Sequence, residues 1–492
     1  MKPNILFIMT DDQGAWAMRC AGNPDIITPN IDALARDGVR FTNFFCASPV
    51  CSPARASIVT GKIPSCHGIL DWLRNGNVNT ADYPGLAGRE NYGKNPGDGG
   101  DAAIDYLAGH ETYIELLNRH GYNCAHSGKW HLGDNVKTKP GFNKGYFTIG
   151  SGGCGYFSAD VHEGADARIH DGYITDLITD KAIGYLNGMY EEDRPFYVSV
   201  HFTAPHSPWD PANHKPEHLK LYAGSDFPHT PRRPIHPWQI ASAPLGDTDA
   251  KRRENLMGYY AAITAADENV GRIVADLKRA GKYDDTIIIF TSDNGMNLGQ
   301  HGIWGKGNGT YPQNMYDSSV KVPFIVSCPA LFGGGRVYDG LACQYDIFHT
   351  LLEFAGADRA PGAKQPGRSL VSAIKSPAQQ DGGTVYIYDE YAQVRMIRTA
   401  GYKYVHRYME GAPCEFFDLT IDPGEELNLF CNTNYTDIIA GLRAELFGFF
   451  DEYGGDYDGS AYYVNGGGQM DFPGREGAFP KAVRHYYPNK RK

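Results

Sequence analysis

The 492-residue sequence predicts an α/β fold in which helices cover both faces of a large, mostly parallel β-sheet. Short apolar runs alternate with amphipathic helical patterns over most of the chain, which is typical of a sheet between two helical layers. Hydrophobic residues make up 42% of the chain and charged residues 21%, as in globular proteins with a large core. After about residue 375, β-rich segments replace this alternation. We therefore expect a main unit over residues 1–375 and a smaller α+β unit with an antiparallel sheet over residues 376–492.

The apolar run at residues 4–10 is the first predicted strand, and a helix is predicted to follow it. Thr28 is suited to cap this helix, Pro29 to open its first turn and Gly38 to end it. Along the main unit we expect further strands at 196–202, 286–291 and 322–327, a long helix through 256–277 and a shorter helix at 347–354. In the smaller unit we expect strands at 385–388, 394–398, 402–407 and 415–419 and a helix at 438–450. Gly-rich stretches at 85–100 and 454–468 are expected to form long loops.

Charge and composition argue against several classes of partner. The chain holds 46 Lys and Arg against 57 Asp and Glu, and its net charge of −11 disfavours nucleic acids and anionic membranes. No apolar run is long enough for a signal peptide or a membrane-spanning helix. The ten cysteines contain no C-x-x-C pair and are interpreted as buried thiols of a reducing compartment. We expect a cytoplasmic protein, or an exported one if a leader was trimmed, whose oligomeric state the sequence does not define.

Polar residues follow three of the predicted strands of the main unit. Asp11 and Asp12 come after the first strand, and His206 and the pair Asp293 and Asn294 come after two later ones. Ligands of open α/β sheets gather beyond the carboxyl ends of the strands, so these side chains are expected at one edge of the sheet. Three carboxylates and an amide oxygen suit Ca²⁺ or Mg²⁺. The sequence thus predicts a divalent cation site, although a helix cap or a turn is the alternative for any single Asp.

The segment from Cys51 to Gly61 carries the sharpest signal in the sequence. Pro53 is suited to begin a helix and Gly61 to end it, which places Cys51 at the positive end of the helix dipole. Arg55 lies one turn along, close enough to pair with a negatively charged reacting group. From these residues alone, Cys51 is either a thiolate nucleophile or a buried structural cysteine.

The eleven residues from Cys51 to Gly61 resemble the signature of the type I sulfatases, which belong to the alkaline phosphatase superfamily. Other segments resemble this family in the expected order: Asp11-Asp12, 128–133, 204–206, 292–295, 305–307, 417–419 and 422–425. The resemblance implies an alkaline-phosphatase-like sandwich fold and hydrolysis of a sulfate ester. It also implies that a separate formylglycine-generating enzyme oxidises Cys51 to Cα-formylglycine, whose aldehyde hydrates to a geminal diol.

The resemblance further implies a role for each motif position. Asp11, Asp12, Asp293 and Asn294 would bind one divalent cation, Ca²⁺ by family expectation, and an oxygen of the modified residue 51 would complete the shell. Arg55 and Lys129 would hold the diol and the sulfate, His131 would act as the base that releases sulfate, and His206 and Lys306 would contact the sulfate and assist the leaving oxygen. With the cation, these basic side chains give a net positive pocket that suits an anionic substrate.

Six residues that flank the motifs are candidates for binding the rest of the substrate: His67, Asp71, Trp72, Trp209, His301 and Tyr311. Ordinary packing is the alternative for each of them. The main interpretation is a sulfatase that acts on a small anionic sulfate ester, such as a sulfated sugar. An aryl or steroid sulfatase, a phosphonate or phosphodiester hydrolase of the same superfamily, and a non-catalytic anion-binding or glycan-binding module are the alternatives.

Overall fold

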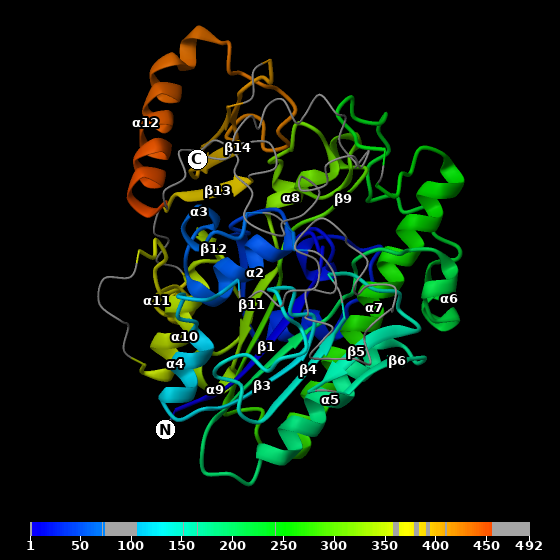
Figure 1. The fold of residues 1–492 in the computed structure, drawn as a ribbon. Helices are drawn as coiled ribbons and strands as arrows, with labels where there is room; N and C mark the ends of the chain where they lie inside the picture. Colours follow the sequence, from blue (N-terminus) through cyan, green and yellow to red (C-terminus); the bar gives the residue numbers. More distant parts are fainter. Residues whose placement is uncertain are drawn as a thin grey trace, which may run out of the picture.

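The architecture comes from a computed structural model of the chain (Figure 1). It describes residues 2–70, 72–73, 106–150, 152–164, 166–241, 243–357, 364–377, 383–389, 394–408 and 411–454. Asp71, the Gly-rich stretch at 85–100 and all but the first residue of the stretch at 454–468 lie outside the described residues. No described helix is long and apolar enough to cross a membrane.

A ten-stranded mixed sheet forms the centre of the main unit, as the sequence predicts. Its strand order is β12-β2-β11-β8-β1-β7-β3-β4-β5-β6. The strands are β1 (Asn4–Thr10), β2 (Gly38–Phe45), β3 (Asn123–Gly128), β4 (Gly145–Ile149), β5 (Ala159–Glu163), β6 (Asp166–His170), β7 (Phe196–His201), β8 (Thr286–Ser292), β11 (Phe324–Ser327) and β12 (Arg336–Cys343). A separate two-stranded ribbon pairs β9 (Asn297–Leu298) with β10 (Trp304–Gly305).

The four central strands run parallel and end together. β1 pairs in parallel with both β7 and β8, and β3 pairs in parallel with β7. In this register Thr10 lies opposite Ser292, and His201 lies opposite both Met9 and Gly128. The residues that follow these strands therefore emerge at one edge of the sheet, which is where ligands of open α/β sheets bind.

Alternate residues of β1 divide the core between the two faces of the sheet. Ile5, Phe7 and Met9 enter one buried cluster, and Leu6 and Ile8 enter the other. The helices α1 (Pro29–Arg36), α5 (Ile174–Met189) and α7 (Asp249–Arg279) supply the cluster of the second face. The helices α2 (Cys51–Thr60), α4 (Tyr113–Arg119) and α10 (Asp346–Ala355) supply the cluster of the first face. Figure 1 shows these two helical layers on either side of the strands.

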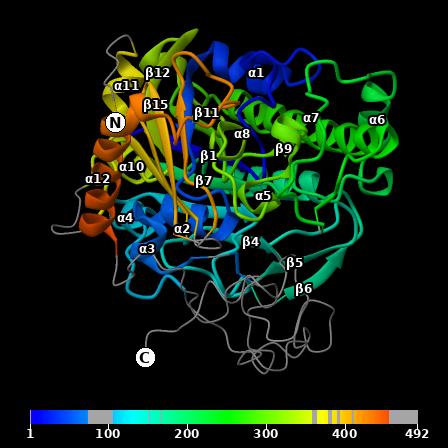
Figure 2. The ribbon, with the colours of Figure 1, turned by 90° about the horizontal axis from the view of Figure 1, so that it is seen from above.

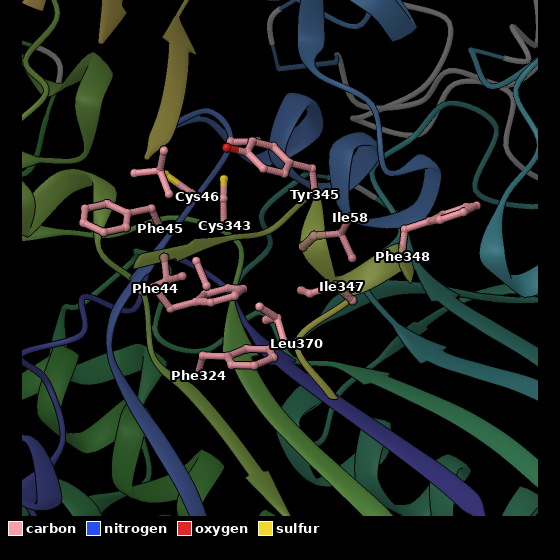
Figure 3. Close-up of a cluster of buried hydrophobic side chains, with 14 of the residues drawn as sticks. Phe44, Phe45, Cys46, Ile58, Phe324, Cys343, Tyr345, Ile347, Phe348 and Leu370 are labelled. Carbon is pink, nitrogen blue, oxygen red and sulfur yellow. The ribbon is translucent and has the colours of Figure 1, made fainter. Parts of the chain in front are cut away.

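Aromatic packing fixes α2 to the sheet. Phe44 of β2 and Phe324 of β11 stack with their ring centroids 3.9 Å apart. Figure 3 shows these rings in one cluster with Ile58 of α2 and Phe348 of α10. All ten residues of α2 are buried. Because close-packed cores resist displacement, the N-terminal end of α2 is held in a defined place above the sheet.

The smaller unit is an antiparallel sheet covered by one helix. Its order is β13-β14-β15-β16, with β13 (Val385–Asp389), β14 (Val394–Arg398), β15 (Tyr402–Arg407) and β16 (Glu415–Asp418). The helix α12 (Thr436–Tyr453) packs against β14 and β15, and Figure 2 shows it beside β15.

The remaining described helices are short. They are α3 (Pro64–His67), α6 (Pro216–Tyr222), α8 (Asp317–Val320), α9 (Pro329–Phe332) and α11 (Val371–Lys375), with short 3₁₀ turns at Arg19–Ala21, Pro211–Asn213, Gln300–Gly302, Gly307–Gly309 and Thr433–Tyr435.

Two predicted helix boundaries and one general prediction need correction. The first helix ends at Arg36 with Asp37 as its C-cap, and Gly38 begins β2 instead of ending the helix. The helix predicted from Pro53 begins two residues earlier, at Cys51, while its end at Gly61 is confirmed by the left-handed backbone of that glycine (φ 66°). All ten cysteines are free, but Cys431 is exposed and four others are only partly buried.

Candidate active site

Loops after the four central strands bring most of the predicted catalytic residues together. Asp11 and Asp12 follow β1, Asp293 follows β8, Lys129 follows β3 and His206 follows β7. Arg55 reaches them from α2, and Lys306 reaches them from the loop after β10. The parallel register of the strands explains the convergence, because each of these loops leaves the sheet at the same edge.

Cys51 is the first residue of α2 and faces the carboxylates. Its Sγ atom lies 3.5 Å from Asp11 Oδ1 and 3.9 Å from Asp12 Oδ1, and the side chain is buried. Burial and the Asp11 carboxylate raise the pKa of the Cys51 thiol well above its usual value. A thiol in these surroundings stays protonated, so the helix dipole alone does not produce the thiolate nucleophile that the sequence left open.

The buried carboxylates form a cluster that suits a divalent cation. Ligand atoms of Asp11, Asp12, Cys51 and Asp293 all lie within 4.8 Å of one another. Burial and the Asp293 carboxylate raise the pKa of Asp11 to about 6. The raised pKa reflects like charges held close together in a buried place, and a cation among the carboxylates would offset their repulsion.

Asn294 adds a neutral oxygen to the cluster. Its amide nitrogen donates to Asp12 Oδ1 over 2.7 Å and to Gly295 O over 3.0 Å. The Oδ1 atom of the same amide is buried and accepts no hydrogen bond from any described residue. Since buried polar atoms are almost always paired, the orphaned oxygen and the oxygen-rich donor set fit a hard cation such as Ca²⁺ or Mg²⁺.

Three basic side chains surround the carboxylates. Arg55 Nε lies 2.8 Å from Asp293 Oδ2, and the Lys129 ammonium contacts Asp11. The Lys306 ammonium lies 2.6 Å from Asp12 Oδ1 and 2.9 Å from Cys51 Sγ. Burial alone would raise the pKa of Asp12, but Lys306 and the His206 ring hold this pKa well below its usual value. Asp12 is therefore ionised in the folded protein, and the three basic groups provide positive charge for an anion.

His131 is arranged to accept a proton. Its Nε2 atom lies 2.7 Å from the carbonyl oxygen of Leu73, which can only accept, so Nε2 carries the hydrogen. The Nδ1 atom is then a free lone pair, and no described residue pairs with it. Burial and the Lys129 ammonium lower the pKa of His131 well below 6.5, so that the ring is neutral near pH 7.

His206 has the opposite arrangement of its ring nitrogens. Its Nδ1 atom lies 2.6 Å from the carbonyl oxygen of Ser207 and so carries a hydrogen. Its Nε2 atom lies 3.7 Å from Asp12 Oδ2, in the pocket. The hydrogen bonds thus leave a different ring nitrogen for proton transfer in each histidine, Nδ1 in His131 and Nε2 in His206.

A pocket of about 530 Å³ opens over Cys51, His131, His206 and Lys306. Trp72 and Trp209, two of the candidates for binding the rest of the substrate, line this pocket. Other lining side chains were not predicted: Met296 and Asn308 each come directly after a quoted motif, and Ile240, Ala243 and Pro244 stand in a loop without one.

Three other candidates do not line this pocket in the described structure. The ring of His67 lies 3.1 Å from Ser57 Oγ and accepts from the Ile69 amide, so this histidine supports α2. His301 stacks on Tyr316 with ring centroids 3.7 Å apart. Tyr311 packs against the core beside the first face of the sheet. We interpret these three residues as structural, whereas Asp71 lies outside the described residues.

Gln344 is a buried residue that sequence reasoning missed. Its amide nitrogen donates to Ser292 O over 3.0 Å and to Asp293 O over 2.6 Å, and its oxygen accepts from the Ala47 amide over 3.0 Å. The side chain therefore joins the loop that bears Asp293 to the segment that leads into α2. No local pattern in the sequence marks it, because its partners lie about fifty and three hundred residues away.

The mixed sheet between two helical layers and the charged pocket at its carboxyl edge define a hydrolase with an alkaline phosphatase-like fold. Residues 3–357 match the sulfatase family, and residues 299–451 match the C-terminal region of N-sulphoglucosamine sulphohydrolase. The chain belongs to the sulfatase family and is a sulfatase.

Several sulfatases are similar to this chain over most of their length. An N-acetylglucosamine-6-O-sulfatase of Bacteroides thetaiotaomicron is 29% identical, with 92% of this chain and 86% of that protein covered. A ulvan-active sulfatase of Formosa agariphila is 27% identical, with 94% and 84% covered. A solved structure in complex with its substrate D-glucosamine-2-N,6-O-disulfate superposes with a TM-score of 0.73 at 25% identity and covers 92% of this chain and 98% of that one.

Proposed function

We propose that this sulfatase releases inorganic sulfate from a sulfate monoester of a carbohydrate, with a formylglycine made from Cys51 as its nucleophile. The observation that carries the proposal is the place of Cys51. It begins α2 within 4 Å of Asp11, Asp12 and Lys306, yet its thiol is held protonated. A plain cysteine there is a poor nucleophile, whereas a hydrated aldehyde supplies one hydroxyl to attack sulfur and a second whose deprotonation expels sulfate.

A cation in the cluster would be held by oxygens of Asp11, Asp12, Asp293 and Asn294, and we propose Ca²⁺. When bound it would polarise the sulfate and the oxygen of residue 51. Arg55, Lys129 and Lys306 would hold the sulfate and stabilise the charge that grows in the transition state. His206, when it carries hydrogens on both ring nitrogens, would give its Nε2 proton to the leaving oxygen as the ester bond to sulfur breaks. His131 would then take the proton of the second hydroxyl at Nδ1 as inorganic sulfate departs.

Two observations favour a sugar as the leaving group. The similar sulfatases named above act on N-acetylglucosamine and ulvan sulfates, and one solved relative holds a sulfated glucosamine. The pocket presents Trp72, Ile240 and Met296 beside the polar Asn308. Such a mixture of apolar surface and a few polar groups suits the apolar face and the hydroxyls of a pyranose ring.

Burial of Cys51 also bears on maturation. In the folded chain its side chain is only 3% exposed. We therefore propose that the formylglycine-generating enzyme acts on the chain before folding is complete. Protein for assay needs a host that supplies this partner, and its conversion is checked by the mass of the peptide that contains residue 51.

The test is a sulfate-release screen with converted protein and added Ca²⁺. Substrates are positionally defined sulfated mono- and disaccharides, an aryl sulfate, a steroid sulfate and an aryl phosphonate. We expect the highest kcat/KM on one sulfated sugar, and a loss of roughly 10³-fold or more in the Cys51→Ala variant. Faster turnover of the phosphonate, or a Cys51→Ala variant as active as the parent, would contradict the proposal.

A further inference from the structure

The loop between β4 and β5 passes against both catalytic histidines. Gly152, Gly153 and Gly155 of this loop line the pocket together with Cys154. The Cys154 side chain turns toward Thr203, with Sγ 3.8 Å from Oγ1. At Gly152 and Gly153, therefore, only backbone atoms line the side of the pocket that faces the two histidines.

Neither glycine leaves room for a side chain. A Cβ atom at Gly152 would lie 2.3 Å from Nε2 and 2.4 Å from Cε1 of His131. A Cβ atom at Gly153 would lie 2.7 Å from Cε1 and 3.1 Å from Nδ1 of His206. Neither glycine has a left-handed backbone, so alanine could adopt its conformation. The three nearest atoms that an added Cβ would meet at each position all belong to the histidine ring, so the ring would have to shift.

The hydrogen bonds of the two rings make these contacts chemically important. The clash at Gly152 falls on the His131 nitrogen that is bound to Leu73 O, and this bond leaves Nδ1 as the free lone pair. The clash at Gly153 falls beside the His206 nitrogen that is bound to Ser207 O. Displacing either ring would disturb the bond that sets its tautomer.

We propose that Gly152 and Gly153 are positioning residues, Gly152 for His131 and Gly153 for His206. Each allows the backbone to support one ring in the orientation that proton transfer requires. The kinetic part of this inference rests on the histidine roles under the proposed function. The steric part concerns only the folded protein and is tested without activity.

The steric test is a set of double-mutant cycles followed by thermal unfolding. We expect Gly152→Ala to lower the melting temperature by roughly 1–3 °C in the parent and by almost nothing in a His131→Ala background, where the ring is gone. Gly153→Ala should behave in the same way with His206→Ala. In the crossed pairs, Gly152→Ala with His206→Ala and Gly153→Ala with His131→Ala, the two changes in melting temperature should be additive. Gly184→Ala, on the surface of α5 with open space around its Cβ, is the matched control and should not lower the melting temperature.

The kinetic test separates the two histidines. With a nitrophenyl sulfate, converted Gly152→Ala should show a burst of about one nitrophenol per enzyme and a steady rate reduced by up to roughly 10²-fold, because sulfate release is slowed. Gly153→Ala should show no burst. Its loss should be larger for a sugar sulfate than for the nitrophenyl ester, because the poorer leaving group depends more on a proton from His206.

Two outcomes would overturn the inference. If Gly152→Ala and Gly153→Ala destabilise the protein equally with and without their histidines, the rings are not what the glycines accommodate. If the cycles show coupling but both variants turn over like the parent, the glycines do not position the histidines for catalysis. If converted parent protein releases no sulfate from any substrate, the proposed function fails, and the thermal cycles still decide whether the glycines support the rings.

Discussion

The structure gathers the predicted side chains that belong to the family motifs more completely than those that only flank them. Asp11, Asp293 and Lys306 belong to three separate segments that resemble the family, and the structure brings all three close to Cys51. His301 flanks the motifs in sequence, but its ring stacks on Tyr316 instead of lining the pocket. Nearness along the chain does not specify which way a loop side chain points.

Asn294 is the most informative residue for the cation. Replacing it by alanine removes the orphaned oxygen and the donor to Asp12. We expect Asn294→Ala to weaken Ca²⁺ binding by roughly tenfold or more, measured by calorimetry and by the rise in melting temperature with added Ca²⁺. Asn187→Ala, on the exposed side of α5, is the control. Equal Ca²⁺ affinity in Asn294→Ala and the parent would rule out this oxygen as a ligand.

At the scale of elements, the strands with the longest apolar runs were predicted, and β2, β3, β4, β5, β6 and β12 of the large sheet were not. The strands β1, β7 and β8 are close to their predicted bounds because each contains a continuous apolar run: ILFIM in β1, FYV in β7 and IIIF in β8. The central strand β3 has the sequence NCAHSG and was not predicted. Its polar groups are satisfied inside the fold, as where His126 lies 2.9 Å from Ser199 Oγ and Ser127 donates to Ile178 O. Such long-range pairing leaves no local periodicity to detect.

Gln344 connects two elements of the site, and we expect its replacement to lower the affinity for Ca²⁺. Gln344→Met keeps the volume but removes the bonds to Asp293 O and Ala47 N. We expect a loss of about 10–100-fold in Ca²⁺ affinity, with a smaller change in melting temperature without Ca²⁺. The matched control is Gln365→Met, since Gln365 is buried and donates to Thr60 O at the far end of α2. The idea fails if both variants bind Ca²⁺ alike.

The helix α5 contains two glycines that packing does not require. A Cβ atom at Gly184 or Gly188 would meet no atom within 4 Å. Each change to alanine should raise the free energy of unfolding by about 0.5–1 kcal/mol, because alanine loses less backbone entropy in a helix. Urea denaturation measures this. Gly145→Ala, whose Cβ would lie 2.3 Å from the Tyr185 ring, should instead destabilise the protein. Lower stability of Gly184→Ala would contradict the expectation.

At the scale of the whole molecule, a buried ion cluster joins the smaller sheet to the main unit. Lys403 of β15 is fully buried, and its ammonium lies 2.5 Å from Asp317 Oδ1 of α8 and also contacts Glu425. Glu425 in turn accepts from the Asp317 amide over 2.6 Å. The change to β-rich sequence after residue 375 indicated a second unit, but not this attachment, because each partner looks like an ordinary surface charge in the sequence.

The cluster should make stability depend on pH. Burial and the Asp317 carboxylate raise the pKa of Glu425 to about 7, above the 4.5 of an exposed Glu. A raised pKa means that the folded state favours the protonated carboxyl. The contribution of Glu425 to the free energy of unfolding is therefore complete below pH 4.5 and is lost as the pH rises through 7. Between pH 5 and 8 the parent should lose about 1–3 kcal/mol relative to Glu425→Gln, whose amide stays neutral and can still accept from Asp317.

Urea unfolding at several pH values measures this difference. Glu426→Gln, which breaks only the exposed ion pair with Arg233, should keep the pH dependence of the parent. If the parent and Glu425→Gln follow parallel curves, Glu425 titrates alike in both states and does not couple the two units to pH. If the parent instead gains stability as the pH rises, the Lys403 ammonium outweighs burial at Glu425, and the carboxylate is the form that the junction between the two units stabilises.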